Sequence, residues 1–269
     1  MKRIFQLAFI LLLFSSSCEQ INFQPNEVRF KDEDTNTNKK NIERVANLKI
    51  GPNDTLFVAL ISDTQLSENQ LSTAVKAINR ETRVDMVFHC GDITDAGTSK
   101  EFTWMKGLMD GLKAPYITVV GNHDCLGNGK ENYKAVFGEF NFTFSVAGHK
   151  FIFFNTNTWE FENDEEYTAP DLDWLSKEVA DSAGFQDTYV IAHVGPMHEE
   201  FGVVNAEQYH EIIKNNQVKL SIHGHGHRYK AGYLFGADVP YLCVDNVRDE
   251  NYVFLKIFQD GSSHELIWY

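Results

Sequence analysis

Side chains of the kinds that bind metal ions occur in five short clusters along the chain. They combine carboxylate, amide and imidazole donors, in the order Asp63 with Gln65, Asp92, Asn122, His193, and His225 with His227. A mixed set of this kind suits Mn, Fe or Zn better than Mg or Ca. Each cluster alone carries little information, but their sequence positions predict a shared metal site if the fold brings them together.

Each cluster directly follows a run of apolar and β-branched residues, which is typical of a buried strand. These runs cover residues 56–61, 86–90, 116–120, 189–192 and 218–222. In open α/β sheets, ligands bind outside the carboxyl ends of the strands. We therefore expect the five clusters to meet at one edge of a sheet structure.

Helical and extended patterns alternate from residue 55 onward. Helices are expected at 68–80, 99–112, 130–137, 170–180 and 206–215. Further strands are expected at 142–146, 150–155, 229–235, 241–244, 252–258 and 264–268. Early βαβ units followed by a β-rich second half predict an α/β protein with two packed sheets and helices outside.

The ordered clusters resemble the motifs of the calcineurin-like metallophosphoesterases. Those motifs run D-x-H, G-D-x-x-D, G-N-H-D/E, a lone His and G-H-x-H, and the matching segments here are 62–65, 91–95, 121–124, 192–196 and 224–227. The resemblance spans about residues 55–227. It implies a four-layer α/β/β/α sandwich over residues 51–269, in which two mixed sheets pack face to face.

The same resemblance implies a centre of two divalent ions. The first ion would be held by Asp63, Asp92 and His227 with Gln65 contributing, and the second by Asp92, Asn122, His193 and His225. Two ions about 3.5–4 Å apart can hold an attacking hydroxide and a phosphoryl oxygen together, and they lower the pKa of bound water toward about 7. The expected substrate is a small phosphate ester.

Two residues are expected to act in catalysis beyond the metals. His123 follows Asn122 directly, so its imidazole can face the substrate, stabilise phosphoryl oxygens and protonate the leaving group. Asp124 is expected to orient that imidazole, as carboxylates commonly do for functional histidines. Asp95 is expected to hold a ligand or to cap its loop.

Gln65 departs from the family pattern, which usually has histidine at this position. A neutral amide oxygen is a weaker donor toward transition metals than imidazole, so the first ion is expected to bind less tightly. Two functions remain open on this basis: a phosphoesterase that slightly prefers diesters to monoesters, and a non-catalytic or weakly active metal- or phosphate-binding protein. The intact His123 and Asp124 favour the enzyme, because a binding protein needs neither.

Purely structural interpretations also exist for single ligands. In isolation, Asp63 would cap a helix, Asn122 would be a turn residue and His193 a core histidine, while His225 and His227 would form a zinc tract with His223. The complete ordered set disfavours these interpretations. The histidines that match no motif are expected to be structural or exposed: His89, His149, His198, His210 and His264.

The N-terminus has the pattern of an export signal. Lys2 and Arg3 precede an apolar run over residues 4–14, and small residues then precede Cys18. The run is about half of the ~20 residues that span a bilayer. This pattern resembles a bacterial lipobox, so we expect a signal peptide at 1–17, a lipidated Cys18 and a flexible polar tether over 18–50. Plain secretion and an uncleaved anchor remain alternatives.

Composition narrows the expected partners. The formal charge of −14 becomes −16 once Lys2 and Arg3 are removed, which disfavours binding to nucleic-acid backbones. Cys90, Cys125 and Cys243 are an odd number at irregular spacing and predict buried free thiols rather than a disulfide framework, although a Cys90–Cys125 bridge remains open. We expect an exported monomer that is held at the periplasmic, outer-membrane or cell surface by its lipid.

Overall fold

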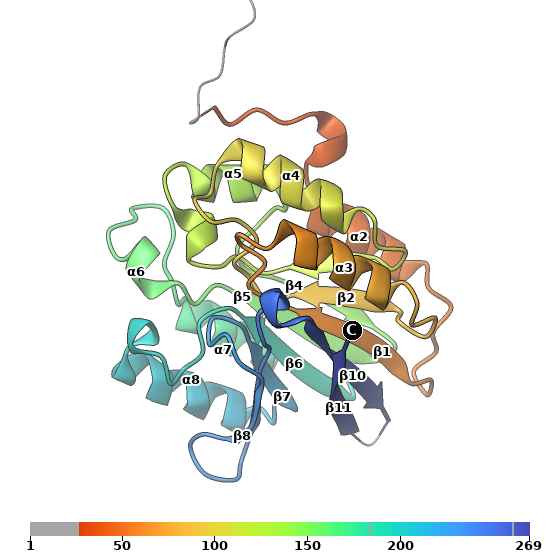
Figure 1. Ribbon diagram of the computed structural model, residues 1–269. Helices are drawn as coiled ribbons and strands as arrows, with labels where there is room; N and C mark the ends of the chain where they lie inside the picture. The colour runs from red at the N-terminus through yellow and green to blue at the C-terminus, as the bar shows by residue number, and fades with distance from the viewer. Residues whose placement is uncertain (1–26, 183, 260) are drawn as a thin grey trace, which may run out of the picture.

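Two β-sheets pack face to face in the computed structural model, which describes residues 27–182, 184–259 and 261–269 (Figure 1). The first sheet has the order β11-β10-β1-β2-β3 and the second has the order β4-β5-β6-β7-β9-β8. The strands of the first sheet are β1 (Leu56–Ile61), β2 (Met86–His89), β3 (Tyr116–Thr118), β10 (Asn251–Phe258) and β11 (Gly261–Trp268). Those of the second are β4 (Phe142–Val146), β5 (His149–Phe154), β6 (Asp187–Ala192), β7 (Leu220–His223), β8 (Lys230–Tyr233) and β9 (Pro240–Cys243).

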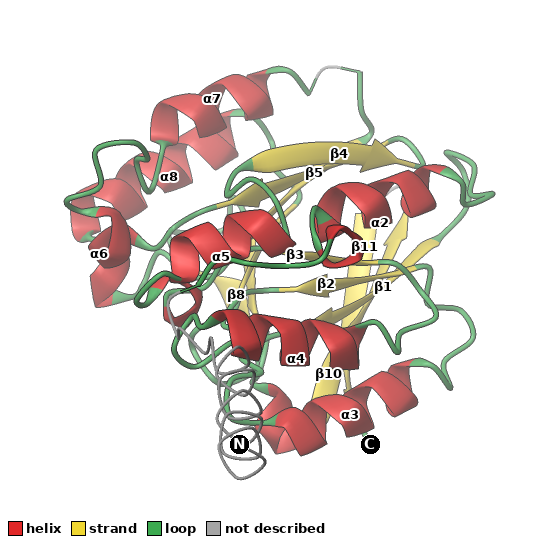
Figure 2. Ribbon diagram, turned by 90° about the horizontal axis from the view of Figure 1, so that it is seen from above, coloured by secondary structure: helices red, strands yellow, loops and turns green. Residues whose placement is uncertain are grey.

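The helices are α2 (Thr37–Ala46), α3 (Glu68–Ile78), α4 (Ser99–Met109), α5 (Gly129–Val136), α6 (Thr158–Phe161), α7 (Leu172–Ala180) and α8 (Val203–Asn215). Helices α3 and α4 cover the outer face of the first sheet and α7 and α8 that of the second, whereas α2 packs beside the edge strand β3. Figure 2 shows α3 and α4 on one side of the strands and α7 and α8 on the other. Short 3-10 turns complete the chain at η1 (Asp32–Asp34), η2 (His123–Cys125), η3 (Glu199–Phe201) and η4 (Val247–Asp249). The predicted four-layer α/β/β/α sandwich of two mixed sheets is confirmed.

Alternation along the strands creates these layers. In β1, Val58 and Leu60 point into the core between the sheets, whereas Ala59 and Ile61 pack against the helices. Successive side chains of a strand lie on opposite faces, so a continuous apolar run is buried on both. Between the sheets, the ring of Phe88 meets those of Phe144, Phe151 and Phe153 edge-on, with centroids 5.1–6.1 Å apart.

The segment expected to be a tether differs from that prediction. Thr37–Ala46 forms α2, which packs beside β3, and Val45 is 1 % exposed within the core. Asn38 donates from Nδ2 to the carbonyl of Thr118 at 3.0 Å and accepts from the Thr118 N–H at 2.9 Å. Its carboxamide thus satisfies the free edge of β3 as a neighbouring strand would. The tether prediction is therefore wrong over 37–46.

Polar composition is the reason why this helix was not predicted, because three of its buried residues are Thr37, Asn38 and Asn41.

The predicted signal peptide at 1–17 and the predicted lipidation at Cys18 lie outside the described residues. Among residues 27–182, 184–259 and 261–269, no helix has the length and apolar character needed to cross a bilayer.

Candidate metal centre

The five predicted clusters meet at one end of the two sheets. Strands β1, β2 and β3 run parallel to each other, as do β6 and β7, so the loops that follow them leave on the same side. Asp63 lies in the loop after β1, Asp92 in that after β2, and Asn122 in that after β3. His193 directly follows β6, and His225 and His227 follow β7. The parallel strands therefore place all seven predicted ligands in one region.

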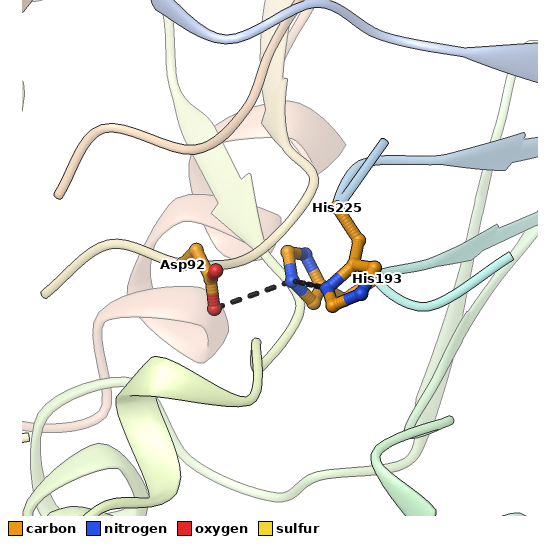
Figure 3. Close-up of side chains that lie close together, drawn as sticks. All are labelled: Asp92, His193 and His225. Atoms are coloured by element: carbon orange, nitrogen blue, oxygen red, sulfur yellow. Dashed lines mark hydrogen bonds and ion pairs between the residues drawn. The ribbon is translucent and has the colours of Figure 1, made fainter. Parts of the chain in front are cut away.

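One group of donors forms around Asn122. The Oδ1 atom of Asn122 lies 3.0 Å from His193 Nε2 and 3.0 Å from His225 Nδ1. His193 Nε2 is also 3.2 Å from Asp92 Oδ1. Figure 3 shows Asp92, His193 and His225 directed toward one another. These four side chains are those predicted to hold the second ion.

The orientation of His193 is fixed by a backbone carbonyl. Its Nδ1 lies 2.7 Å from Cys90 O, which can only accept a hydrogen bond, so Nδ1 carries the proton and Nε2 faces the other donors. Burial alone would lower the pKa of His193, but the adjacent Asp92 carboxylate outweighs this effect and raises that pKa to about 10. The site therefore attracts positive charge, and a bound metal ion would displace the proton that Nε2 carries while Nδ1 keeps its own.

A second group contains Asp63, Asp92 and His227. His227 Nε2 lies 3.1 Å from Asp63 Oδ1, and the backbone N–H of His225 donates to Asp63 Oδ2 at 3.1 Å. The hydrogen bond to Asp63 raises the pKa of His227 above its usual value. Gln65 donates from Nε2 to Asp92 Oδ2 at 3.2 Å, while its Oε1 is buried without a hydrogen-bond partner. This orphan oxygen is the atom that Gln65 would offer to a cation.

The charge of the centre suits a cation. Asp63 and Asp92 are 2 % and 1 % exposed, yet among the described residues no lysine or arginine forms an ion pair with either carboxylate. Buried charges are normally paired or coordinate metals. With two buried carboxylates, imidazole and amide donors, and the orphan oxygen of Gln65, the residues present fit a centre for divalent metal ions.

Backbone strain accompanies the ligands. Asp63, Asp92, His225 and His227 all have left-handed φ angles, of 54°, 58°, 61° and 47°. Each such non-glycine residue costs about 1–3 kcal/mol, and residues of this kind gather at functional sites. Gly121 allows the closest approach, because a Cβ there would lie 2.0 Å from Asp92 N and 2.2 Å from Asp92 Oδ1.

His123 lies at the open side of the centre. Its side chain is 36 % exposed, and its backbone N–H donates to Asp92 Oδ1 at 3.0 Å. Its Nδ1 lies 2.8 Å from the carbonyl of Asp95, which again makes Nδ1 the donor and leaves Nε2 for another group. The Asp95 carboxylate is 3.5 Å from the same nitrogen. Asp95 is thus the residue that orients His123.

Asp124 has a different role from the one predicted. Its fully buried carboxylate accepts from the backbone N–H groups of Gly121, Ile93 and Thr94 and from the Thr94 hydroxyl, at 2.8–3.2 Å. The prediction that it orients His123 is wrong. Side chains of adjacent residues in a 3-10 turn diverge by about a third of a turn, so the two point apart. Asp124 instead ties the loop after β2 to the loop after β3.

Two residues near the centre were missed by sequence reasoning. His198 Nδ1 lies 3.1 Å from His225 Nε2, and Glu200 Oε2 lies 3.7 Å from the same atom. Burial, followed by the carboxyl of Glu160, raises the pKa of Glu200 to about 8. His198 had been expected to be structural or exposed. The available signal was its place in the loop after β6, five residues beyond His193.

The free thiols follow the prediction, because Cys90 and Cys125 are buried and unbridged and Cys243 is also free.

Comparison with known proteins agrees with this geometry. The family model for calcineurin-like phosphoesterases matches residues 58–229. The chain belongs to this family. A probable cyclic nucleotide phosphodiesterase of Xenorhabdus bovienii is 23 % identical over 167 residues, 57 % of this chain and 65 % of the relative. A probable metallophosphoesterase of Methanocaldococcus jannaschii is 32 % identical over 74 residues, 27 % of this chain and 33 % of the relative. The chain thus spans less than two thirds of the curated relatives it matches.

Solved structures share the phosphoesterase fold. A purple acid phosphatase from yellow lupin superposes with a TM-score of 0.63 at 15 % identity, covering 80 % of this chain and 51 % of that one. GAP50, the anchor in the inner membrane complex of Plasmodium, superposes with a TM-score of 0.61 at 14 % identity, covering 80 % and 84 %. At these identities the likeness concerns the fold alone.

Proposed function

We propose that this phosphoesterase-family chain hydrolyses phosphate esters at a centre of two divalent transition-metal ions, Mn, Fe or Zn. One observation carries the proposal: the buried carboxylates of Asp63 and Asp92 lie among imidazole and amide donors, and no lysine or arginine of the described residues pairs with either of them. When bound, the ions would supply Lewis acidity that lowers the pKa of a water molecule and neutralises phosphoryl oxygens. Asp92 belongs to both donor groups and would hold both ions.

The protein's own residues supply the remaining chemistry. His123 is held through Nδ1 by the Asp95 carbonyl, so its Nε2 is free to contact a phosphoryl oxygen and to protonate the leaving group. The exposure of its ring places this nitrogen where a substrate can arrive from solvent. His193, held by the Cys90 carbonyl, has no such freedom and serves as a ligand.

We further propose that diesters are preferred to monoesters. Two relatives support this preference by their names: the Xenorhabdus cyclic nucleotide phosphodiesterase, and a probable glycerophosphodiester phosphodiesterase of Arcobacter nitrofigilis that is 37 % identical over 62 residues, 23 % of this chain and 21 % of the relative.

The test is hydrolysis of p-nitrophenyl phosphate and of bis(p-nitrophenyl) phosphate with added Mn²⁺, in wild type, His123→Gln and His264→Gln. His264 lies on β11 beside Tyr229 and is a control for loss of a histidine elsewhere. We expect His123→Gln to lose about 10²–10⁴-fold in rate and His264→Gln to retain the wild-type rate. Full activity in His123→Gln would overturn its role.

A second candidate is a metal- or phosphate-binding protein without turnover. Gln65 favours it, because an amide that donates to Asp92 replaces an imidazole ligand. Binding of Mn²⁺ and phosphate by calorimetry, with no hydrolysis under Mn²⁺, Fe²⁺ or Zn²⁺, would establish this candidate over the enzyme.

We also propose that the chain is an exported, membrane-anchored monomeric lipoprotein. The sequence of residues 1–18 supports export and lipid anchoring. Detergent partitioning of the full chain and of Cys18→Ser in a bacterial host tests it: wild type is expected in the membrane fraction and the variant in the aqueous fraction. Recovery of both in the aqueous fraction would contradict lipid anchoring.

A further inference from the structure

A cavity of about 260 Å³ lies directly beside the metal centre, on the side of His225. His225 and His198 form part of its wall, and the same His225 ring has its Nδ1 3.0 Å from Asn122. The cavity extends from there toward β8 and β9. A molecule held at the centre therefore has this cavity as its immediate neighbour.

Apolar side chains form much of the cavity wall. Met197, Tyr233 and Leu234 line it, and Met197 and Tyr233 are 65 % and 58 % exposed. Large apolar side chains that stay exposed around a concave surface mark binding sites rather than core packing. Drug-sized ligands occupy pockets of about 300–1,000 Å³, so this smaller cavity suits a group of one ring.

Two cations line the same cavity. Arg228 and Lys230 belong to its wall, and within the described residues neither side chain forms an ion pair or a hydrogen bond. The chain as a whole carries a formal charge of −14. Free positive groups in an acidic protein, placed next to an apolar wall, favour a ligand that is both flat and anionic.

The position of the cavity decides which part of a substrate it receives. The leaving group must lie near His123, the proposed proton donor, and His123 does not line the cavity. The cavity is therefore available to the ester group that stays on phosphorus. A monoester has no such group.

We propose that this cavity is a subsite for the retained group of a phosphodiester, namely a single aromatic ring that carries a further anionic substituent. Met197 and Tyr233 contact the ring, and Arg228 pairs with the anion. The proposal rests on the proposed function and adds to it the substrate class.

The test uses three diesters with the same leaving group: methyl, phenyl and 4-carboxyphenyl p-nitrophenyl phosphate. Because the leaving group is constant, differences in KM report on the retained group. We expect KM to fall about tenfold from methyl to phenyl and to fall again for 4-carboxyphenyl. In Tyr233→Ala the phenyl-to-methyl ratio of kcat/KM should approach one. Arg228→Gln should abolish the advantage of 4-carboxyphenyl over phenyl.

Two matched controls complete the experiment. Trp268→Ala removes an aromatic side chain of similar exposure on β11, and Arg80→Gln removes an exposed guanidinium just beyond α3. Both should keep the wild-type ratios. Equal KM values for the three diesters in wild type, or unchanged ratios in Tyr233→Ala and Arg228→Gln, would overturn the subsite. Absence of hydrolysis of all three by wild type would instead overturn the proposed function.

Discussion

Backbone carbonyls, rather than carboxylates, orient the imidazole rings of His193 and His123. Cys90 O holds His193 and Asp95 O holds His123, in both cases through Nδ1. Each ring therefore presents Nε2, one to the ligand group and one to the open side. A motif read in sequence identifies the histidine but not the atom that orients it.

Substitutions of Asp92 and of His123 should distinguish loss of metal binding from loss of catalysis alone. Asp92→Ala removes the carboxylate shared by both donor groups, so we expect loss of metal and activity together. His123→Gln should lose activity and keep metal. Elemental analysis of purified protein provides the measurement, and two ions per chain in Asp92→Ala would contradict the ligand assignment.

His89 should make stability depend on pH. Its Nδ1 accepts from the Gly91 N–H and its Nε2 lies 3.0 Å from the Thr64 hydroxyl, so the neutral ring is fully bonded. Burial, and then His193, lower the pKa of His89 to about 3. In the unfolded chain, His89 binds a proton below about pH 6.5, whereas in the folded chain it does so only below about pH 3. Between these two values the unfolded state binds more protons, so the free energy of unfolding falls as the pH decreases.

Urea unfolding of metal-free wild type and His89→Gln between pH 7 and 4 measures this effect. The wild-type free energy of unfolding should fall more steeply with decreasing pH, by at most about 1.4 kcal/mol per pH unit. Parallel curves for the two proteins would show that His89 is not responsible.

The candidate metal ligands were more predictable than the residues that orient the imidazole of His123. Asp63, Asp92, Asn122, His193, His225 and His227 were located by their order after strands, and the structure brings them together. The exchange of roles between Asp95 and Asp124 depends on the direction of side chains in the η2 turn, which no spacing encodes. His198 and Glu200 approach only through the path of the loop after β6.

At the scale of elements, the loops after β2 and β3 fit together at the contact of Gly121 with Asp92. The buried Asp124 carboxylate joins the same two loops through four donors. The apolar runs in the sequence predicted where these loops begin, because long apolar runs are the most reliable signal of a buried strand. The short helix α6 is absent from the expected elements, since four residues give no usable periodicity.

Gly121→Ala should disrupt the centre. Its new Cβ would lie 2.0 Å from backbone of Asp92, so a loop must shift, and we expect lower metal content and lower stability. Gly107→Ala is the control: it lies in α4, where a Cβ meets nothing within 4 Å, and should stabilise by about 0.5–1 kcal/mol. Thermal unfolding measures the stability of both variants, and elemental analysis measures their metal content. Equal stability and equal metal content in the two variants would contradict the close approach of Gly121 to Asp92.

At the scale of the whole molecule, residues 37–46 belong to the folded domain. Helix α2 closes the edge of the first sheet through Asn38 and contributes Val45 to the core between the sheets. The two-sheet architecture was predictable from the order of strands and helices. This closure was not, because a helix that buries asparagine and threonine has the composition of a solvated linker.

Asn38→Leu should show the importance of this closure. It leaves the Thr118 N–H buried without a partner, which costs about 1–3 kcal/mol, while the Thr118 C=O keeps the hydrogen bond from the Tyr133 hydroxyl at 3.0 Å. Asn47→Ala, at the exposed end of α2, should change stability by less than about 0.5 kcal/mol. Equal unfolding midpoints in urea for the two variants would show that the edge of β3 does not need Asn38.

The pairing of Asn38 with Thr118 also bears on the order in which the chain acquires structure. The two residues are 80 positions apart, so a ribosome finishes α2 long before it supplies the strand on which α2 rests. A helix of ten residues is marginal by itself in water. Residues 37–46 should therefore stay unfolded during synthesis until β3 has been made, a delay that would suit the proposed export.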